Sequence, residues 1–574
     1  MRKNFHIVIV SPRGGKRTHV IILGICAYYH DAAAALVVDG TPVAFAEEER
    51  FSRHKHTGEF PVQAIKYCLD QAGLKIHEVD HIAFYFNPRI VLSSFARDLP
   101  GLITRHGIRA AYQRGLWTAS FMREVDLLRH RLNYRGSITW VEHHKAHAAY
   151  VFYLSPFERA AILTLDSIGE RATTTISLGE SNSITTIEAI YDPHSLGYLY
   201  GAVTQHLGYK RGDREGTVMA LAAYGDPSVY DFENVLHIAP NGRFTLNLIY
   251  VARRYSWADG RRLTPAFEEK FGPARKPDEP ITDHHRNLAA ALQARTEQAV
   301  LALSERALKL TDSHYLCMAG GVALNSVINS RVRTQLGVRG LFIAPAANDA
   351  GTALGAALYV YAAQTGLRPN VQERVYLGPK YDDADIRYLL ELTDVPYEYL
   401  DKPAQKAASL LTQGNIIGWF QGRMESGPRT LGNRSILADP SIPDIKDRIN
   451  ARVKFREPFR PFAPSVLHEH QHKWFSCGSL DLPYMLEVVE FLPNQASKVP
   501  AVMHVDNTAR IQTVRRDMNP MYYSLIHAFH ELKGIPMILN TSFNVKGEPI
   551  VCSPSDALRC FYSTGLDALI WSIS

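Results

Sequence analysis

One order of elements occurs twice in the first third of the chain, and it constrains the fold more than any other sequence feature. Residues 21–47 are predicted to form a strand, a turn that carries Asp31, and a hairpin. Residues 160–190 repeat this order, with Asp166 in the turn. A duplicated unit of this kind favours two similar lobes that close on a nucleotide. The alternative is a chance similarity between two hairpins.

The length of 574 residues exceeds what one hydrophobic core supports, so two or more domains are expected. We assign residues 1–20 to an N-terminal extension and 21–365 to the domain that contains the repeat. Residues 366–375, which open with Gly-Leu-Arg-Pro, are predicted to be a linker, and residues 376–574 a second domain.

Composition indicates a cytoplasmic protein. The basic N-terminus and the apolar segment behind it imitate a signal peptide, but Tyr28-Tyr29-His30-Asp31 interrupts that segment, and we predict a buried strand instead. No other apolar stretch approaches the roughly 20 residues of a membrane span. Six scattered cysteines, without a Cys-x-x-Cys pair, favour a reducing compartment and argue against structural zinc.

The net charge of +6 permits an anionic ligand without demanding nucleic acid. Arginines are concentrated in the helical residues 95–135. That segment is either a nucleic-acid surface or a solvated helical insertion. We favour the insertion, because few aromatic residues are interleaved with the arginines.

The segment 140–147, Trp-Val-Glu-His-His-Lys-Ala-His, is predicted to lead from a strand into a helix. There His143 and His147 are four residues apart and project from one face, whereas His144 points elsewhere. Two neutral imidazoles suit zinc or iron, and Asp349, in a turn after a later strand, can add a carboxylate. The alternative is a polar helix start with incidental histidines.

Two further patterns indicate phosphate binding. Residues 315–325 are predicted to form a strand, a Gly320-Gly321 turn and a helix, where a backbone can approach phosphate or ribose. The second domain carries arginines on several loops that are stiffened by Gly and Pro, and a guanidinium matches phosphate bidentately. Ordinary ion pairs explain any one of these arginines, but they explain several such loops poorly.

Seven motifs, in this order, resemble those of the nodulation- and antibiotic-type O-carbamoyltransferases, and the resemblance covers residues 21–570. The motifs are His30-Asp-Ala-Ala-Ala, Glu47-Glu-Glu-Arg-Phe-Ser-Arg53, His143-x-x-x-His147, Gly320-Gly-Val-Ala-Leu-Asn325, Gly422-Arg-Met-Glu-Ser-Gly-Pro-Arg429, Arg456-Glu-Pro-Phe-Arg460-Pro and Asn540-Thr-Ser-Phe-Asn544.

The resemblance implies an α/β protein in which a duplicated actin/Hsp70-like ATPase-type domain precedes a YrdC-like α/β domain. It implies an ATP-dependent transfer of the carbamoyl group of carbamoyl phosphate, through carbamoyl-adenylate, to a hydroxyl of a small natural product or sugar. Aminoglycoside, macrolide, nodulation oligosaccharide and cephem acceptors are all compatible with it. Carbamoyl-adenylate hydrolyses in water, so we expect two separate pockets joined by an enclosed route.

The resemblance also implies roles by matched position. Carbamoyl phosphate and ATP would be bound in the second domain by Arg429, Lys454, Arg460, Arg510, Asn540 and Ser542. Fe2+ or another divalent metal would be held by His143, His147 and Asp349, with Mg2+ as a further admissible cofactor. The nucleotide in the first domain would contact Asp166, Gly320, Gly321 and Asn325.

His30 would act as the catalytic base on the acceptor hydroxyl, and Lys55 would lie beside the acceptor. Histidine titrates in the range that this step needs; the alternative is a turn histidine held by Asp31. Three other functions compete: a sugar-kinase-like phosphotransferase, a tRNA-modifying carbamoyl-adenylate enzyme and a non-catalytic nucleotide-binding protein. The second domain argues against a kinase, and we expect neither a nucleic-acid partner nor a membrane.

Overall fold

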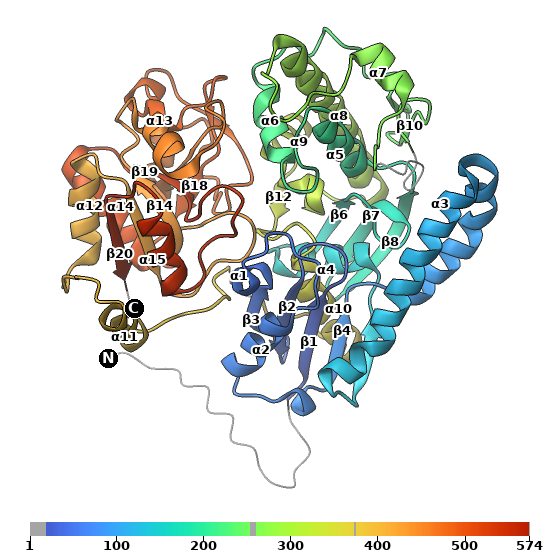
Figure 1. Cartoon of the computed structure of the whole chain (residues 1–574), viewed down its shortest axis with the longest axis horizontal. Coiled ribbons are helices and arrows are strands. Elements are labelled where there is room, and N and C mark those ends of the chain that lie inside the picture. The colour runs from blue at the N-terminus through green and yellow to red at the C-terminus, as the bar shows by residue number, and fades with distance from the viewer. Residues whose placement is uncertain (1–18, 253–259, 372–374, 573–574) are drawn as a thin grey trace.

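The computed structural model describes residues 19–252, 260–371 and 375–572 (Figure 1). The predicted extension, residues 1–20, lies outside the described residues except for 19 and 20, and so do residues 372–374 of the predicted linker. In the described residues, no helix combines the length and the apolar character needed to cross a membrane. All six cysteines are buried and free.

Two five-stranded sheets share one topology. The first has the order β3-β2-β1-β4-β5 and the second the order β8-β7-β6-β11-β12. The first contains β1 (Ile21–Cys26), β2 (Ala33–Val38), β3 (Thr41–Glu47), β4 (His81–Phe84) and β5 (Ser137–Trp140). The second contains β6 (Arg159–Leu165), β7 (Ala172–Glu180), β8 (Ser183–Tyr191), β11 (Tyr315–Ala319) and β12 (Gly340–Ile343).

The pairing directions agree as well. The opening strand of each sheet, β1 or β6, pairs antiparallel with its hairpin and parallel with the strand on its other side. The predicted repeat is therefore confirmed, and chance similarity of two hairpins does not explain it. That the two lobes close on a nucleotide stays a prediction.

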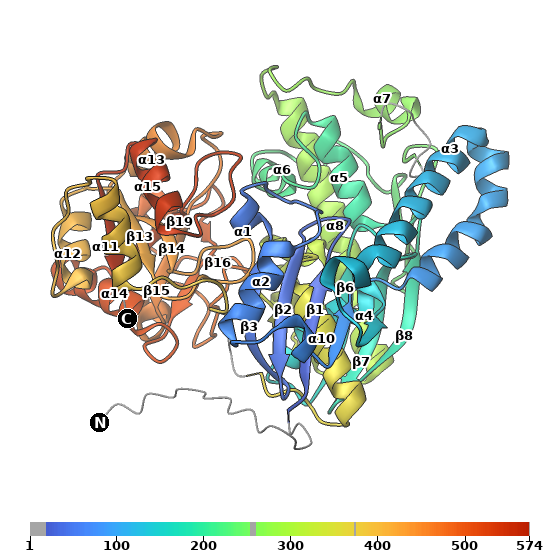
Figure 2. The same cartoon turned by 60° about the horizontal axis from the view of Figure 1, so that its bottom comes forward.

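Two helices, α4 (His143–Leu154) and α10 (Gly351–Thr365), are buried against these sheets (Figure 2). Small residues allow the close approach: a Cβ on Gly24 of β1 would lie 1.9 Å from the carbonyl oxygen of Ala353. A Cβ on Gly355 would lie 2.0 Å from the carbonyl oxygen of Ala146. The alanine- and glycine-rich sequence of α10 is thus required by packing, and that packing fixes the ends of both helices.

The Arg-rich segment forms α3 (Pro88–Leu132), which projects from the body of the protein (Figure 1). In a straight helix, residues 16 positions apart lie about 24 Å apart. In α3, however, Asp98 and Arg114 form an ion pair of 3.0 Å. The helix therefore doubles back on itself, and the predicted helical character of this segment is confirmed.

The second half contains a six-stranded sheet of order β18-β15-β19-β14-β13-β20. Its strands are β13 (Ile417–Gln421), β14 (Arg434–Ala438), β15 (Ala463–Leu467), β18 (Gln512–Val514), β19 (Met537–Ser542) and β20 (Ala568–Ser572). One face packs on α12 (Pro403–Thr412) and α14 (Pro520–Lys533), and the other on α13 (Ile445–Ile449) and α15 (Pro554–Tyr562). A sheet covered by helices on both faces confirms the predicted α/β class.

The remaining helices are α1 (Glu49–Ser52), α2 (Val62–Gln71), α5 (Leu196–His206), α6 (Glu215–Ala222), α7 (Pro265–Phe271), α8 (Asp283–Thr311), α9 (Ser326–Leu336) and α11 (Asp383–Leu392). Two small hairpin-like pairs complete the described strands: β9 (Leu236–Ile238) with β10 (Phe244–Leu246), and β16 (Val489–Glu490) with β17 (Thr508–Ala509).

Candidate active site

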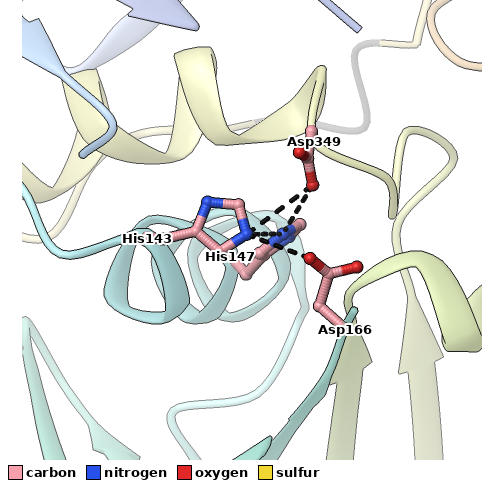
Figure 3. A group of neighbouring side chains, drawn as sticks. All are labelled: His143, His147, Asp166 and Asp349. Carbon is pink, nitrogen blue, oxygen red and sulfur yellow. Dashed lines mark hydrogen bonds and ion pairs between the residues drawn. The ribbon is translucent and has the colours of Figure 1, made fainter. Parts of the chain in front are cut away.

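Four buried side chains converge at the end of α4 (Figure 3). His143 and His147 come from α4, Asp166 follows β6, and Asp349 stands just before α10. The Nε2 atom of His143 lies 3.2 Å from Asp166 Oδ2 and 3.2 Å from His147 Nε2. Asp349 Oδ1 lies 3.6 Å and 3.5 Å from the two Nε2 atoms.

This donor set fits a metal ion. Atoms held about 2.1 Å from one first-row metal lie roughly 3.0–3.4 Å from each other, close to the separations seen here. Two imidazoles and two carboxylates are ligands that iron and zinc both accept. Burial lowers the pKa of His147 to about 4, so its imidazole is neutral at pH 7 and able to bind a metal.

The two carboxylates carry more negative charge than their surroundings balance. Burial, and then the charge of Asp166, raises the pKa of Asp349 to about 7. Burial also acts to raise the pKa of Asp166, but the hydrogen bond with His143 and the charges of the nearby histidines together outweigh it, and the pKa is lowered. A bound cation would keep both carboxylates ionised, because an ion is the largest charge in such a site.

The third histidine of α4 is a structural residue. His144 Nδ1 lies 2.7 Å from the Thr164 hydroxyl, and His144 Nε2 lies 2.9 Å from the carbonyl oxygen of Ala172. Its ring therefore points toward the second sheet, away from the four-residue cluster, as the helical spacing predicted.

A second group surrounds His30. The rings of His30 and His56 stack with centroids 4.9 Å apart. Their Nδ1 atoms lie 3.0 Å and 2.7 Å from the two oxygens of Asp31, which is 7% exposed. Asn348 donates a 2.6 Å hydrogen bond to Asp31. Because Asn348 precedes Asp349, Asp31 connects the histidine pair to the segment that carries a metal-ligand candidate.

Asp213 completes this group from a loop after α5. Its Oδ1 accepts a 2.5 Å hydrogen bond from Lys55 and lies 3.3 Å from His56 Nε2. Burial alone would lower the pKa of both histidines. The carboxylates outweigh it, so that Asp31 raises the pKa of His30 to about 9, and Asp213 with Asp31 raises that of His56 to about 10. Both rings are therefore protonated at pH 7.

The second half contributes cations without matching carboxylates. Among the described residues, no carboxylate pairs with Arg429, Arg510 or Lys454, and Lys454 is only 4% exposed. The Lys454 ammonium donates instead to Ser542 Oγ (3.1 Å) and Asn544 Oδ1 (2.8 Å). Glu457 lies 3.9 Å from Arg460 and does not balance the group.

The charges of this cluster act on one another. Burial, and then the positive charge of Arg460, lowers the pKa of Arg429 to about 10 and that of Arg456 to about 9. Burial, and then Arg429, lowers the pKa of Arg510. Guanidinium groups that repel one another in this way are stabilised by an anion placed between them.

One cavity of about 660 Å³ is lined by both groups. From the first half, its wall includes His30, Lys55, His56, Asp166, Asp213, Gly321, Asn325 and Asp349; from the second half, it includes Arg429, Lys454, Arg456, Arg460 and Ser542. The expectation of two separate pockets is therefore wrong. Residues of the two halves line this one cavity together.

Several predicted site residues stand apart from this wall. Gly320 allows a close approach to β6, since a Cβ there would lie 2.2 Å from the carbonyl oxygen of Leu165. Asn540 is buried and donates to Ser465 (3.0 Å) and Gln512 (3.1 Å). Arg510 does not line the cavity, although the charge of Arg429 helps to lower its pKa. His143 and His147 lie fully buried behind the two carboxylates.

Three residues have contacts in the site that the sequence did not predict. Asp166 lies in the candidate metal-ligand cluster, and its Oδ1 accepts a 3.1 Å hydrogen bond from the Gly321 N–H; that it contacts a nucleotide stays a prediction. The sequence repeat indicates a site role for Asp166, because Asp166 follows β6 in the same way that the site residue Asp31 follows β1. His56 adjoins Lys55, whereas no local pattern indicates Asp213.

Comparison with known proteins establishes the class. Residues 21–358 match the profile described as the carbamoyltransferase N-terminus, and residues 408–572 match the carbamoyltransferase C-terminus. The chain belongs to the carbamoyltransferase family and is an enzyme of that family. The predicted resemblance is thereby confirmed.

Within the family, relatives align over nearly the whole chain. Nodulation protein NolNO of Sinorhizobium fredii is 38% identical over 95% of this chain and 78% of its own length. Nodulation protein U of Rhizobium tropici is 28% identical over 92% of each chain. The uncharacterized protein sll1178 of Synechocystis is 40% identical over 96% of this chain and 95% of its own length.

Solved structures give weaker matches. Full-length HypF in its phosphate- and nucleotide-bound form is 11% identical, with 61% of this chain and 56% of that chain covered and a TM-score of 0.32. Component A of the (R)-2-hydroxyglutaryl-CoA dehydratase of Acidaminococcus fermentans is 14% identical, with 60% and 98% covered and a TM-score of 0.31. Scores this low support no argument about fold or mechanism.

Proposed function

We propose that the protein is an ATP-dependent O-carbamoyltransferase that converts carbamoyl phosphate to carbamoyl-adenylate and carbamoylates a hydroxyl of a small molecule. One observation carries the proposal: the unpaired cations of the second half and the histidine and metal-ligand groups of the first half line the same cavity. An activating site and a transfer site are thus within reach of one intermediate. On this proposal the repeated lobes are actin/Hsp70-like and the second half is YrdC-like.

Activation is assigned to the cationic group. Arg429, Lys454 and Arg460 would bind the phosphates, with Ser542 as a hydroxyl donor beside Lys454. Carbamoyl phosphate, ATP and water give carbamoyl-adenylate, phosphate and pyrophosphate, so every phosphorus atom is accounted for. The charge that develops on pyrophosphate is stabilised by guanidinium groups that are already in place and need no reorganisation.

Transfer is assigned to the His30 group. In its neutral form, His30 would accept the proton of the acceptor hydroxyl at Nε2, an atom that no described residue engages in a hydrogen bond. The acceptor oxygen attacks the carbamoyl carbon, and the bond to the adenylate oxygen breaks to release AMP. Lys55 would orient the acceptor, and Gly321 and Asn325 would hold the nucleotide. A metal bound by His143, His147, Asp166 and Asp349 would neutralise charge on the leaving phosphate.

The test supplies wild-type protein with ATP and carbamoyl-labelled carbamoyl phosphate. We expect labelled carbamoyl-adenylate and pyrophosphate, because the cationic group acts on the α-phosphate. Arg429→Ala should lower pyrophosphate formation about 100-fold or more. His30→Asn should leave it nearly unchanged and should prevent AMP release when aminoglycoside, macrolide, oligosaccharide and cephem acceptors are offered. Arg387→Ala, an exposed substitution on α11, serves as the control.

Other products would point to other functions. Formation of ADP with a phosphorylated sugar would identify a kinase, and label that enters only tRNA would identify a tRNA-modifying enzyme. Absence of label from the nucleotide would refute carbamoyl-adenylate formation. Loss of the same step in Arg429→Ala and His30→Asn would refute the division of roles between the two halves.

A further inference from the structure

The motif Glu47-Glu-Glu-Arg-Phe-Ser-Arg53 has no part in the proposed chemistry, yet it lies between the two halves of the molecule. It spans the end of β3 and the short helix α1, on the side of the first half that faces the second (Figure 2). Arg50 is only 3% exposed, although it is charged. It forms ion pairs with Glu47 and, at 3.0 Å, with Glu49.

The buried Glu47–Arg50 ion pair binds one residue of the second half, Gly427, through two hydrogen bonds. Arg50 Nη2 donates a 2.9 Å hydrogen bond to the carbonyl oxygen of Gly427. In return, the Gly427 N–H donates a 3.0 Å hydrogen bond to Glu47 Oε1. Both polar groups of Gly427 are thus bound by the same ion pair. Hydrogen bonds to buried charged groups are stronger than neutral ones, so this contact resists displacement.

A second contact, with Pro345, also restricts Gly427. Its φ angle is +92°, and a Cβ at this position would lie 2.5 Å from the carbonyl oxygen of Pro345. Pro345 belongs to the segment that continues to Asn348 and Asp349. Only glycine satisfies both the backbone angle and the contact, so Gly427 occupies a slot between the Glu47–Arg50 pair and the metal-ligand segment.

Residues next to this slot also belong to the cationic group and to the histidine pair. Beyond Gly427, Arg429 lines the cavity. Glu49, which pairs with Arg50, accepts a 2.7 Å hydrogen bond from the backbone N–H of His56, and the His56 ring stacks on His30. The slot therefore joins the cationic loop, the histidine pair and the segment before Asp349 at a single point.

We propose that Glu47, Arg50 and Gly427 form a latch that holds Arg429 at a fixed distance from His30, so that carbamoyl-adenylate is retained for transfer instead of escaping to water. The latch rests on the proposed function. We assign its members as positioning residues: Glu47 and Arg50 line the cavity, but their charged groups are engaged with each other and with Gly427. A misplacement of about 1 Å at an active site can cost roughly 100-fold in rate, so a rigid contact between the halves has a direct chemical consequence.

The test measures two products without an acceptor, using ATP labelled in the adenine ring and carbamoyl phosphate. Pyrophosphate reports activation, and free AMP reports loss of the intermediate to water. In the wild-type protein we expect pyrophosphate formation to stop after about one turnover, because the intermediate stays enclosed. In Arg50→Ala and Gly427→Ala we expect the ratio of AMP to pyrophosphate to rise about tenfold, with the initial rate of pyrophosphate formation nearly unchanged.

Arg423→Ala is the matched control. Arg423 also spans the halves, with a 3.0 Å hydrogen bond to the carbonyl oxygen of Val43, but it contacts neither Gly427 nor the cavity. The ratio of AMP to pyrophosphate in Arg423→Ala should equal that of the wild-type protein. Arg50→Lys should retain more carbamoyl-adenylate than Arg50→Ala does. If Arg50→Ala does not fold, the ratio of AMP to pyrophosphate in Gly427→Ala tests the latch instead, because this substitution keeps both residues of the Glu47–Arg50 pair.

Two outcomes overturn the latch. One is a ratio that stays at the wild-type value in both Arg50→Ala and Gly427→Ala. The other is a loss of pyrophosphate formation as large as the loss of retention, since the latch residues would then serve only the second half. Failure of the proposed function is distinct from both: wild-type protein itself would form no pyrophosphate.

Discussion

Asp31 is a single carboxylate with three partners, and it determines the proton affinity of the proposed base. It lies within 3.0 Å of His30 and His56 and accepts a hydrogen bond from Asn348. Without Asp31, burial and the neighbouring His56 would both lower the pKa of His30. Because Asp31 raises that pKa to about 9, His30 is mostly protonated at pH 7 and becomes neutral, and able to act as a base, as the pH approaches 9.

This gives a prediction with a defined sign. A base must be neutral, so transfer by wild-type protein should rise with pH toward about 9, the pKa of His30. Asp31→Asn removes the charge that raises this pKa, and the pKa should fall by about 2 pH units or more. Histidine NMR titration measures it directly, with the His30 signal assigned by its loss in His30→Asn.

Asp70→Asn, at the exposed end of α2, is the control and should leave the titration unchanged. An unchanged His30 pKa in Asp31→Asn would contradict the electrostatic role of Asp31. It would indicate that Asp31 only orients the two rings.

At the scale of the element, helix α4 presents two histidines to the candidate metal site and a third to the second sheet. A helix rotates by about 100° per residue, so His143 and His147 share a face that His144 cannot share. The strand-to-helix connection places that face against the ends of β6 and α10, where the carboxylates stand. A rotation of about 100° therefore directs His143 to the candidate metal ligands and the adjacent His144 to the second sheet.

We predict that His147→Ala and His144→Ala fail in different ways. His147→Ala should lose bound metal, with affinity lowered at least about 100-fold, because a ligand is removed. His144→Ala should retain metal but lower the free energy of unfolding by about 1–3 kcal/mol, since Thr164 and the Ala172 carbonyl lose their partner. Elemental analysis and denaturant unfolding measure the two effects; equal metal loss in both variants would contradict the assignment.

At the scale of the whole molecule, the anion site lies where the two halves meet. Glu457 in the second half is 4.0 Å from Arg214 of the first half and 3.9 Å from Arg460 of the second. Arg214 also pairs with Asp213 at 3.7 Å, so the cations that lack enough carboxylates at this junction are Arg460 and its neighbours in the second half. Without an anion, the repulsion among these cations lowers the stability of the folded protein. A bound anion should strengthen the contact between the two halves.

Pyrophosphate should accordingly stabilise the folded protein. At one hundred times its dissociation constant, a ligand adds about 2.7 kcal/mol to the free energy of unfolding, and Tm should rise. Arg460→Ala should reduce this rise strongly. Arg452→Ala, which removes an exposed arginine paired with Asp567, should leave it unchanged. A rise of equal size in both variants, measured by calorimetry, would contradict an anion site at this junction.

The sequence by itself determined the features that depend on neighbours along the chain. The repeat could be predicted because alternating apolar residues and turn residues define a hairpin locally. The shared face of His143 and His147 follows from helical geometry, and stiff loops around Arg429 and Arg460 indicated anion binding. The α/β class was implied by the resemblance of seven ordered motifs to a known family.

Only the tertiary structure decided how these parts meet. It added Asp166 to the metal-ligand cluster, brought Asp213 to Lys55 and His56, and merged the two expected pockets into one. The contact that joins the halves links Arg50 to Gly427, which are 377 positions apart. Local periodicity carries no information about such a contact, because it depends on the packing of complete sheets and on glycines that let their backbones approach.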